Sequence, residues 1–321
     1  MLSEPARQVC TPATQVAMPR FPLSICLALL TADTAATTAA RAQTPAPSRT
    51  RVFMLGTGNP NADPDRFGPA TVILVDTTAY LVDCGVGVVR RWAAAGRASP
   101  DVPKPWMLRR LFITHLHSDH TLGYADLIFS SWTLAGETRS PLEVFGPSGT
   151  RAMTDHLLAA YTEDIRIRSS EGGESAGAKP PVVQVHEIKP GVVYQDALVK
   201  VTAFVVHHGT VPQAFGFRVQ TPDRDVVISG DAGPPSTIPE QCHGCDILIH
   251  EGGFFHRDSA TVYRRTFHTS MEDIVSVARA AQPKLLVLYH LPPGDMPAGL
   301  QFIRAGYSGR VVVAHDLDVF R

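Results

Sequence analysis

The stretch Leu-Arg-Arg-Leu-Phe-Ile-Thr-His-Leu-His-Ser-Asp-His, residues 108–120, places a dense run of polar side chains directly after an apolar strand. Four potential metal ligands lie at its end: His115, His117, Asp119 and His120. A loop that leaves a strand can turn two of these side chains to one side and two to the other, which favours two cations held close together. Imidazole and carboxylate ligands suit zinc, and also iron or manganese. The alternative is a polar surface loop in which these four residues met by chance.

Apolar strands that end in polar clusters recur along the chain. We expect strands at 51–55, 71–75, 79–82, 108–114, 142–145, 182–186, 198–206, 214–220, 226–229, 247–250, 285–289 and 311–314. We expect helices at 86–95, 122–134 and 152–161, and another that starts at Ser270 within the capping box of residues 269–272. This alternation predicts an α/β fold in which two mixed sheets pack face to face with helices outside.

The composition allows a large core and shows no charge surplus. Of the 321 residues, 44% are hydrophobic and 18% are charged, which is typical of a folded protein. The formal net charge is -1 at pH 7. Proteins that bind phosphate backbones usually carry a basic surplus, so this balance removes one argument for a nucleic-acid substrate without excluding one.

The N-terminal residues have the pattern of a secretory leader. A short apolar run at 21–30 follows Arg20, and small residues then lead to Ala40-Arg41-Ala42, an A-x-A cleavage signature. The run is too short to span a bilayer, which takes about 20 residues. A disordered Ala/Thr-rich tail is the alternative. We predict a signal peptide over 1–42, a Pro/Ser/Thr-rich linker over 43–50, a catalytic domain over 51–321, and a periplasmic or secreted location.

Three cysteines follow the predicted leader: Cys84, Cys242 and Cys245. The last two form a C-x-x-C pair. A single pair of this kind is a weak zinc signal, and a disulfide is equally allowed in an exported protein. Two unlinked thiols in a loop are the third possibility, and the sequence leaves the choice open.

The His115–His120 motif resembles that of the metallo-β-lactamase superfamily, within it the branch of ribonuclease Z, arylsulfatase and cyclic-nucleotide phosphodiesterase. The resemblance covers nearly all of residues 51–321, because the later motifs follow in the family's order. It implies a four-layer αββα sandwich of two mixed sheets with outer helices. It also implies that Asp83, in Leu81-Val-Asp83-Cys-Gly85, supports the metal-binding loop.

The resemblance extends the proposed metal ligands to three later positions. The family's third motif is a histidine after a strand, and here His207 and His208 compete for it. We favour His208, because the ligand in this branch usually precedes a glycine, as His208 precedes Gly209. Asp231, after the strand 226–229, matches the aspartate that bridges both metals, and His290 matches the last ligand. Taken alone, each of these residues could equally be a turn or loop residue.

Two further residues match the ribonuclease Z branch. His250-Glu251 ends a strand, and His268 precedes the capped helix. The resemblance implies that His268 donates a proton to the leaving group and that Glu251 orients it. An unrelated ion pair and a simple helix flank are the alternatives. The remaining histidines match no motif and are interpreted as surface or structural residues: His156, His186, His243, His256 and His315.

The expected chemistry is metal-assisted hydrolysis of an ester. Two Zn²⁺ ions, or Mn²⁺ or Fe in their place, would share a water and lower its pKa toward about 7, so that a metal-bound hydroxide exists at neutral pH. Asp119 would bind one metal and could also accept the proton of that water. His268 would protonate the leaving oxygen.

The leader and the loop at 56–66 favour a phosphodiesterase or arylsulfatase that acts on a small phosphate or sulfate ester. So does Val86, which stands where ribonuclease Z usually has glutamate. A tRNA 3′-processing endoribonuclease is the alternative, supported by His268 and Glu251. Against it, residues 151–200 contain no long basic arm that could grip tRNA. A non-catalytic metal-binding or sensor protein ranks third. We expect no membrane association after cleavage, and a homodimer is possible.

If the leader is cleaved, mature protein from the native cell begins near Gln43 and lies outside the cytoplasm. N-terminal sequencing combined with cell fractionation measures both properties. An intact N-terminus on cytosolic protein would contradict the prediction.

Overall fold

The computed structural model describes residues 48–135, 140–170, 173, 179–292 and 296–321. They belong to one compact unit, Pro47–Arg321. The predicted signal peptide at 1–42 and most of the predicted linker at 43–50 lie outside the described residues. The periplasmic or secreted location rests on that signal peptide and therefore stays a prediction. Among the helices that are described, none is long and apolar enough to cross a membrane.

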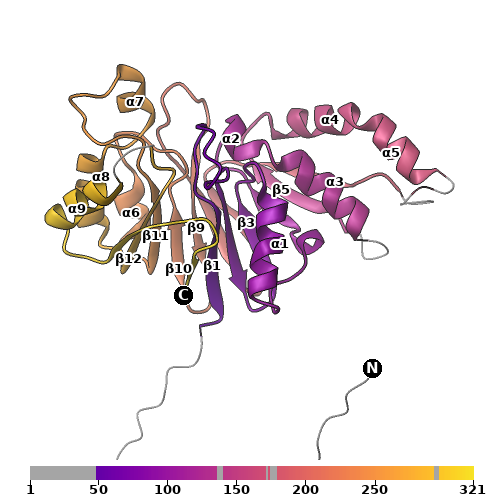
Figure 1. Ribbon diagram of the computed structural model, residues 1–321, viewed down its shortest axis with the longest axis horizontal. Coiled ribbons are helices and arrows are strands. Elements are labelled where there is room, and N and C mark those ends of the chain that lie inside the picture. The colour runs from indigo at the N-terminus through magenta and orange to yellow at the C-terminus, as the bar shows by residue number, and fades with distance from the viewer. Residues whose placement is uncertain (1–47, 136–139, 171–172, 174–178, 293–295) are drawn as a thin grey trace, which may run out of the picture. The chain divides into compact units, whose positions relative to one another are not determined.

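Two seven-stranded sheets form the centre of the fold (Figure 1). The first has the order β14-β1-β2-β3-β4-β5-β6, and its strands are β1 (Thr50–Gly56), β2 (Ala70–Val75), β3 (Thr78–Val82), β4 (Arg110–Phe112), β5 (Leu142–Gly146), β6 (Val183–Glu187) and β14 (Val319–Phe320). The second has the order β13-β12-β11-β10-β9-β8-β7, and its strands are β7 (Gly191–Gln195), β8 (Lys200–Val205), β9 (Phe215–Gln220), β10 (Asp225–Ile228), β11 (Ile247–Glu251), β12 (Leu285–Tyr289) and β13 (Val311–Val313).

Each sheet combines an antiparallel part with a parallel part. Strands β3 to β6 pair in parallel in the first sheet, as do β10 to β13 in the second. Because the carboxyl ends of parallel strands meet at one edge of a sheet, the loops that follow β4, β10 and β12 can carry side chains to a common site.

Helices lie outside the sheets and beside the site. The described helices are α1 (Val88–Ala98), α2 (Ser118–Thr121), α3 (Tyr124–Leu134), α4 (Thr150–Ala160), α5 (Thr162–Ser169), α6 (Ile238–Cys242), α7 (Val262–Phe267), α8 (Met271–Ala281) and α9 (Met296–Gly306), with a 3-10 turn at Pro105–Met107. Helices α1 and α3 share a hydrophobic core with one face of the first sheet, and α6, α8 and α9 do so with the second.

The alternation of side chains along β1 shows how one strand serves two cores. Phe53 and Leu55 pack in the core that faces α1 and α3, whereas Val52 and Met54 pack between the two sheets. Successive strand residues point to opposite faces, so an apolar run without polar positions is the pattern of a strand buried on both sides. The predicted four-layer αββα sandwich is confirmed.

The structure differs from the sequence expectation at several elements. Helices α6, α7 and α9 were not predicted. The histidine stretch was expected to be a loop, but residues 118–121 form the short helix α2. Helix α5 and strand β7 were not predicted, because both are largely exposed and lack a clear apolar face. The last strand was predicted at 311–314, but one more strand, β14, follows β13 and pairs with β1.

The open choice for the C-x-x-C pair is answered by a disulfide between Cys242 and Cys245. Both residues are buried at the end of α6, in the core beneath α8. Cys84 is a free, buried thiol.

Three backbone segments meet beside the histidine stretch with no room for a side chain. A Cβ placed on Gly85 would lie 2.3 Å from the carbonyl carbon of Gly68 and 2.5 Å from the carbonyl oxygen of Asp119. Glycine at position 85 therefore allows the loop after β3 to touch both the loop before β2 and helix α2.

Gly85→Ala should lower the stability of the fold, because these backbone atoms must move apart. We expect a loss of roughly 1–3 kcal/mol, or about 2–10 °C in Tm for a domain of this size. Gly96→Ala is the control: it lies in α1, where an added Cβ would lie 3.9 Å from the Val102 side chain, an ordinary van der Waals contact. Calorimetry of both variants measures the difference, and equal Tm values would contradict the close approach.

Candidate metal centre

The loops that leave the two sheets bring seven side chains to one place. His115 and His117 follow β4, and Asp119 and His120 lie in α2. The other three follow strands of the second sheet: His208 after β8, Asp231 after β10 and His290 after β12. These are the seven residues that the sequence predicts as metal ligands. They form two groups that share no residue, and Asp231 and His290 form a third group together with His268.

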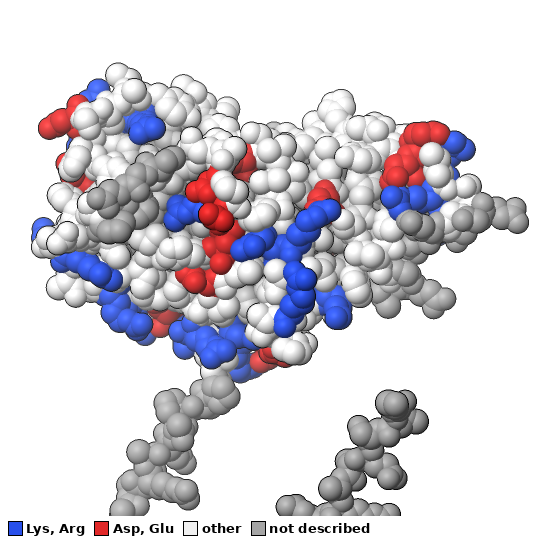
Figure 2. All heavy atoms as spheres, in the orientation of Figure 1, with Lys and Arg blue, Asp and Glu red and all other residues white. Residues whose placement is uncertain are grey.

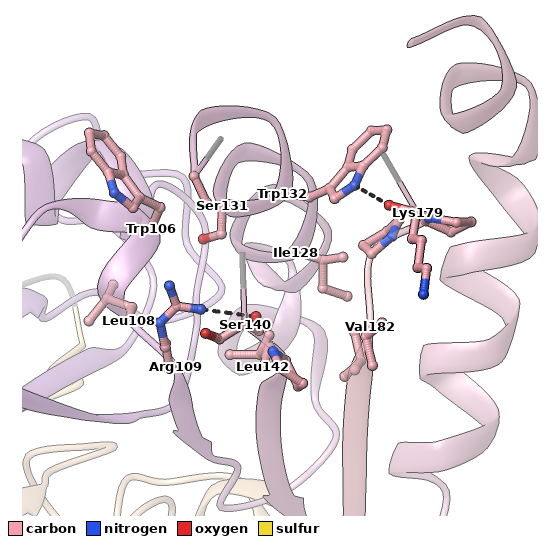
Figure 3. A pocket seen from close by; sticks show the side chains of 15 residues that line it. Trp106, Leu108, Arg109, Ile128, Ser131, Trp132, Ser140, Leu142, Lys179 and Val182 are labelled. Atoms are coloured by element: carbon pink, nitrogen blue, oxygen red, sulfur yellow. Dashed lines mark hydrogen bonds between the residues drawn. The ribbon is translucent and has the colours of Figure 1, made fainter. Parts of the chain in front are cut away.

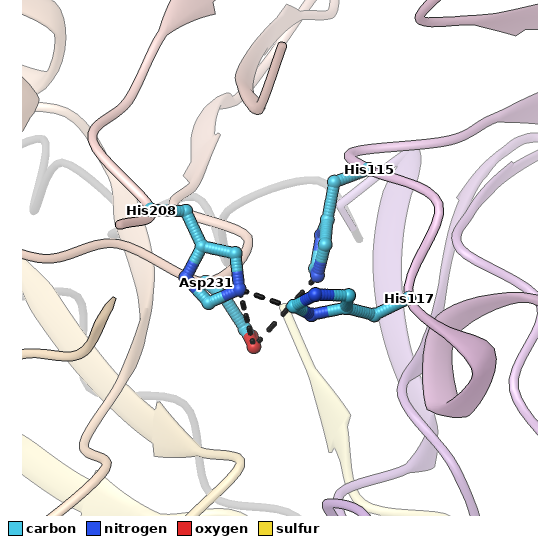
Figure 4. A group of neighbouring side chains, drawn as sticks. All are labelled: His115, His117, His208 and Asp231. Atoms are coloured by element: carbon cyan, nitrogen blue, oxygen red, sulfur yellow. Dashed lines mark hydrogen bonds and ion pairs between the residues drawn. The ribbon is translucent and has the colours of Figure 1, made fainter. Parts of the chain in front are cut away.

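The first group consists of His115, His117, His208 and Asp231, and their ligand atoms lie within 4.8 Å of one another (Figure 4). His208 Nε2 lies 3.1 Å from His117 Nδ1 and 3.7 Å from Asp231 Oδ2. His115 Nε2 lies 3.9 Å from the same carboxylate oxygen. Figure 4 shows His115 and His208 joined to this oxygen by dashed lines, with His117 joined to His208 beside them.

The second group consists of Asp119, His120 and His290, and it meets the other oxygen of Asp231. His290 Nε2 lies 3.1 Å from Asp119 Oδ2 and 3.4 Å from Asp231 Oδ1. His120 Nε2 lies 3.2 Å from Asp231 Oδ1. The two oxygens of Asp231 thus face different groups, which is the arrangement of a bridging ligand.

Four buried atoms of these seven residues make no hydrogen bond: His115 Nε2, His120 Nε2, His290 Nδ1 and Asp231 Oδ1. Buried polar atoms nearly always have a partner, so each such atom calls for an explanation. A divalent cation takes ring nitrogens and carboxylate oxygens as ligands. Here Nε2 of His115, Nε2 of His120 and the Asp231 carboxylate lie close together, and neither nitrogen forms a hydrogen bond. The residues present therefore fit a metal site.

Burial and neighbouring charges shift the pKa values of the Asp231 carboxyl and of several histidines in the cluster. Burial opposes the charge of Asp231, but the surrounding histidines, led by His290 and His120, hold the pKa of its carboxyl well below the usual range. Burial lowers the pKa of His115 well below its usual value, with His120 adding to the effect. Burial also lowers the pKa of His208. A neutral ring is the form that binds metal.

Asp83 holds the histidine stretch in position, as the resemblance implied. Its Oδ1 accepts a hydrogen bond from the backbone N–H of Thr114 at 2.8 Å, and its Oδ2 lies 2.8 Å from His120 Nδ1. Asp83 is 2% exposed and has a positive φ of 58°. The contact with Nδ1 leaves Nε2 of His120 as the nitrogen that faces Asp231.

A further carboxylate near the site, that of Asp316, was not found from the sequence. Asp316 accepts hydrogen bonds from the backbone N–H groups of Thr57 and Phe67, and from the Thr57 hydroxyl. It also lies 3.5 Å from Arg91. The carbonyl of Thr57 in turn accepts from the backbone N–H of His290 at 3.0 Å. Asp316 therefore fixes the loop that holds His290, although no motif marks it.

The structure separates the two adjacent histidines of the third motif. His208 is 2% exposed, and its Nδ1 lies 2.7 Å from the carbonyl oxygen of Phe267. His207 is exposed, and its carbonyl accepts a hydrogen bond from the N–H of Gly233. Only His208 of the two points into the cluster. The five histidines that matched no motif are all exposed: His156, His186, His243, His256 and His315.

His268 and Glu251 lie beside the cluster as a pair. Glu251 Oε2 is 3.4 Å from His268 Nδ1, and Glu251 Oε1 accepts a hydrogen bond from the N–H of Thr269. Asp231 Oδ2 lies 4.0 Å from the same ring nitrogen. Burial opposes the charge on His268, but Glu251 and the two aspartates outweigh it and raise the pKa of His268 to about 9.

Two pockets lie at opposite ends of β4. One of about 240 Å³ borders the cluster and includes Asp119, Ser118 and Arg66. The other, of about 310 Å³, is mainly apolar and includes Leu108 and Arg109, which precede β4 (Figure 3). The second pocket is therefore not part of the metal centre, which follows β4.

Comparisons with known proteins agree with this geometry. The family model of the β-lactamase superfamily domain matches residues 78–291. Ribonuclease Z of Mycobacterium bovis (strain BCG / Pasteur 1173P2) is 31% identical over 278 residues, which cover 83% of this chain and 96% of that protein. Ribonuclease Z of Mycobacterium sp. (strain KMS) is 35% identical over 250 residues, which cover 75% of this chain and 84% of that protein.

Solved structures show the same fold. The metallo-β-lactamase fold protein YhfI from Bacillus subtilis superimposes with a TM-score of 0.66 at 17% identity, covering 84% of this chain and 98% of that one. The short form of human tRNase Z gives a TM-score of 0.63 at 23% identity, with the same coverage. The chain therefore belongs to the metallo-β-lactamase superfamily and is a metal-dependent hydrolase of ester bonds.

Proposed function

We propose that this protein is a phosphodiesterase of the ribonuclease Z type, which cleaves an RNA strand at a metal centre. The observation that carries the proposal is the His268–Glu251 pair, 3.4 Å apart at the edge of the cluster. Cleavage of RNA expels a ribose alkoxide, which needs a proton, and His268 is placed to provide it. The similarity to proteins named ribonuclease Z supports the same choice.

The metal centre is proposed to hold two divalent cations, with zinc favoured by the nitrogen-rich donor set. His115, His117 and His208 would hold one ion, Asp119, His120 and His290 the other, and Asp231 both. When bound, such ions polarise the phosphoryl oxygen and supply a nucleophile at neutral pH.

The protein's own residues divide the remaining tasks. The Asp119 carboxylate borders the pocket beside the cluster and can accept a proton from the attacking water. Glu251 keeps the His268 ring charged and oriented, because one of its oxygens faces Nδ1 while the other is tied to the N–H of Thr269. Nε2 of His268 is then the nitrogen left to deliver a proton.

The comparisons favour this alternative over the phosphodiesterase or arylsulfatase of small esters that the sequence analysis ranked first. The two mycobacterial relatives are both named ribonuclease Z, and neither name refers to sulfate esters. The net charge of -1 argued against RNA, but a total charge says nothing about distribution. On the face shown in Figure 2, basic and acidic side chains are interspersed, and such an arrangement leaves room for local basic sites.

The predicted leader determines which RNA the protein would encounter as a substrate. If the chain is exported, as we propose from residues 1–42, precursor tRNA in the cytoplasm is not its substrate, and RNA outside the cytoplasm is.

The deciding experiment is a panel assay on the purified chain from Gln43 onward. It compares an RNA with an unpaired 3′ extension, bis(p-nitrophenyl) phosphate, a cyclic nucleotide and p-nitrophenyl sulfate. We expect endonucleolytic cleavage of the RNA and hydrolysis of the bis(p-nitrophenyl) ester. Turnover of the sulfate ester without RNA cleavage would overturn the proposal.

The adjacent pair His207 and His208 provides a test of the metal centre. His208→Ala should lower the metal content from about two ions per chain to about one, because the first group loses a ligand. His207→Ala is the matched control and should retain both ions, because its side chain is exposed. Elemental analysis of chelator-free protein measures the content. The reverse pattern would mean that the wrong histidine was assigned.

Replacing His268 should slow esters with poor leaving groups most. A nitrophenolate leaves without a proton, whereas a ribose or alkyl alkoxide does not, so His268→Ala should widen the difference between the two by on the order of 10²-fold. Wild-type cleavage of alkyl esters should fall as the pH rises through the pKa of His268, because the protonated ring is the donor. Glu251→Gln should show the same pattern more weakly.

Steady-state rates on both ester types, together with the metal content, test this assignment. An equal loss on the two esters with metals intact would show that His268 shapes the site without donating a proton.

A further inference from the structure

Helix α7, labelled in Figure 1, contacts the candidate metal centre through Phe267, its last residue. The Phe267 ring packs on the ring of His208 with their centroids 5.2 Å apart, and the Phe267 carbonyl accepts from His208 Nδ1. A Cβ on Gly209 would lie 2.2 Å from the Phe267 ring, so glycine at that position lets the ring approach. These contacts fix α7 at the rim of the cluster.

Tyr263 is an exposed aromatic residue on this helix. Its ring stacks on Phe267, four residues later, with the centroids 4.4 Å apart and an interplanar angle of 25°. The ring also lies 6.2 Å from that of His268. Tyr263 is nevertheless 56% exposed. Phe267 thus supports one face of the ring and leaves much of the residue open beside the proposed proton donor.

Two basic residues follow Tyr263 on the same helix. Arg264 and Arg265 are exposed, and neither guanidinium has a side-chain partner among the described residues. Arg257, earlier in the same segment, differs because it pairs with Asp273. Asp258 is the acidic residue of this segment and is exposed. Figure 2 shows basic side chains, with acidic ones nearby, in the region where Figure 1 places α7.

We propose that α7 binds a nucleotide of the single-stranded RNA that enters the metal centre, with its base stacked on Tyr263 and a phosphate paired with Arg264 or Arg265. Stacking of a base on an aromatic side chain contributes about 1–3 kcal/mol and tolerates any sequence. A guanidinium pairs well with a phosphate. The inference rests on the proposed function and adds the element that selects nucleic acid over small esters.

The first test replaces the aromatic ring. Tyr263→Ala should weaken binding of a short fluorescein-labelled single-stranded RNA by roughly 5- to 150-fold, the range that loss of one stacked base implies. Tyr263→Phe should bind like the wild type, because stacking needs only the ring. Fluorescence anisotropy measures the affinities. An unchanged affinity of Tyr263→Ala would overturn the proposal, as would a Tyr263→Phe variant as weak as Tyr263→Ala.

The second test uses the salt dependence. Arg264→Ala combined with Arg265→Ala should lower the slope of log affinity against log salt by about 0.7 for each phosphate contact that is lost. Arg97→Ala is the matched control, because Arg97 is exposed in the last turn of α1. Its slope should equal that of the wild type. Equal slopes for all three proteins would exclude phosphate contacts by α7.

Activity on bis(p-nitrophenyl) phosphate separates binding from damage to the centre. The loss in kcat/KM on RNA for Tyr263→Ala should exceed its loss on this small ester, which offers no base to stack. Equal losses would assign Tyr263 a structural role and overturn the inference. Tyr263-dependent RNA binding without cleavage by the wild type would instead sink the proposed function alone. Binding of anionic vesicles but not RNA would assign the surface to a membrane and overturn the inference.

Discussion

The buried carboxylate of Asp231 is the group on which the arrangement of the site depends. One of its oxygens faces His115 and His208, and the other faces His120 and His290. A carboxylate that is 2% exposed must be compensated by charge or hydrogen bonds. Since these histidines come from loops of both sheets, the sandwich must be assembled before the carboxylate acquires its surroundings. Cations bound between the two groups would complete that compensation.

The strands and the candidate metal ligands at 115–120 could be predicted from the sequence because their signals are local, whereas His208, Asp231 and His290 were identified through the resemblance to a family. An apolar run such as Leu285–Tyr289 indicates a buried strand by itself, and the residues at 115–120 lie close together in the sequence. Asp316 could not be predicted, because its carboxylate acts on backbone groups 259 and 249 residues earlier. Strand β7 has no fully buried residue and therefore left no apolar pattern.

The substrate was the property that the sequence predicted least well. A nucleic-acid enzyme usually carries a surplus of basic residues, but the net charge of a chain does not show where its basic residues lie. Arg264 and Arg265 lie together on one short helix, α7. Residues 251–270 combine several tasks in a short segment. Glu251 ends β11, α7 covers the cluster, and Ser270 caps α8 through the N–H of Asp273. Because His268 stands between α7 and that cap, the fold restricts its backbone from both sides.

The link from Asp316 to His290 has a consequence for the order in which the molecule can form. Strand β14 pairs with β1, and Asp316 precedes that strand. The loop that meets His290 is therefore held by residues made at the start and at the end of this sequence. During synthesis on the ribosome, the histidines after β4 emerge long before Asp316 does. The complete centre must wait until the last strand has closed the first sheet, so an elongating chain carries its ligands but not yet their final geometry.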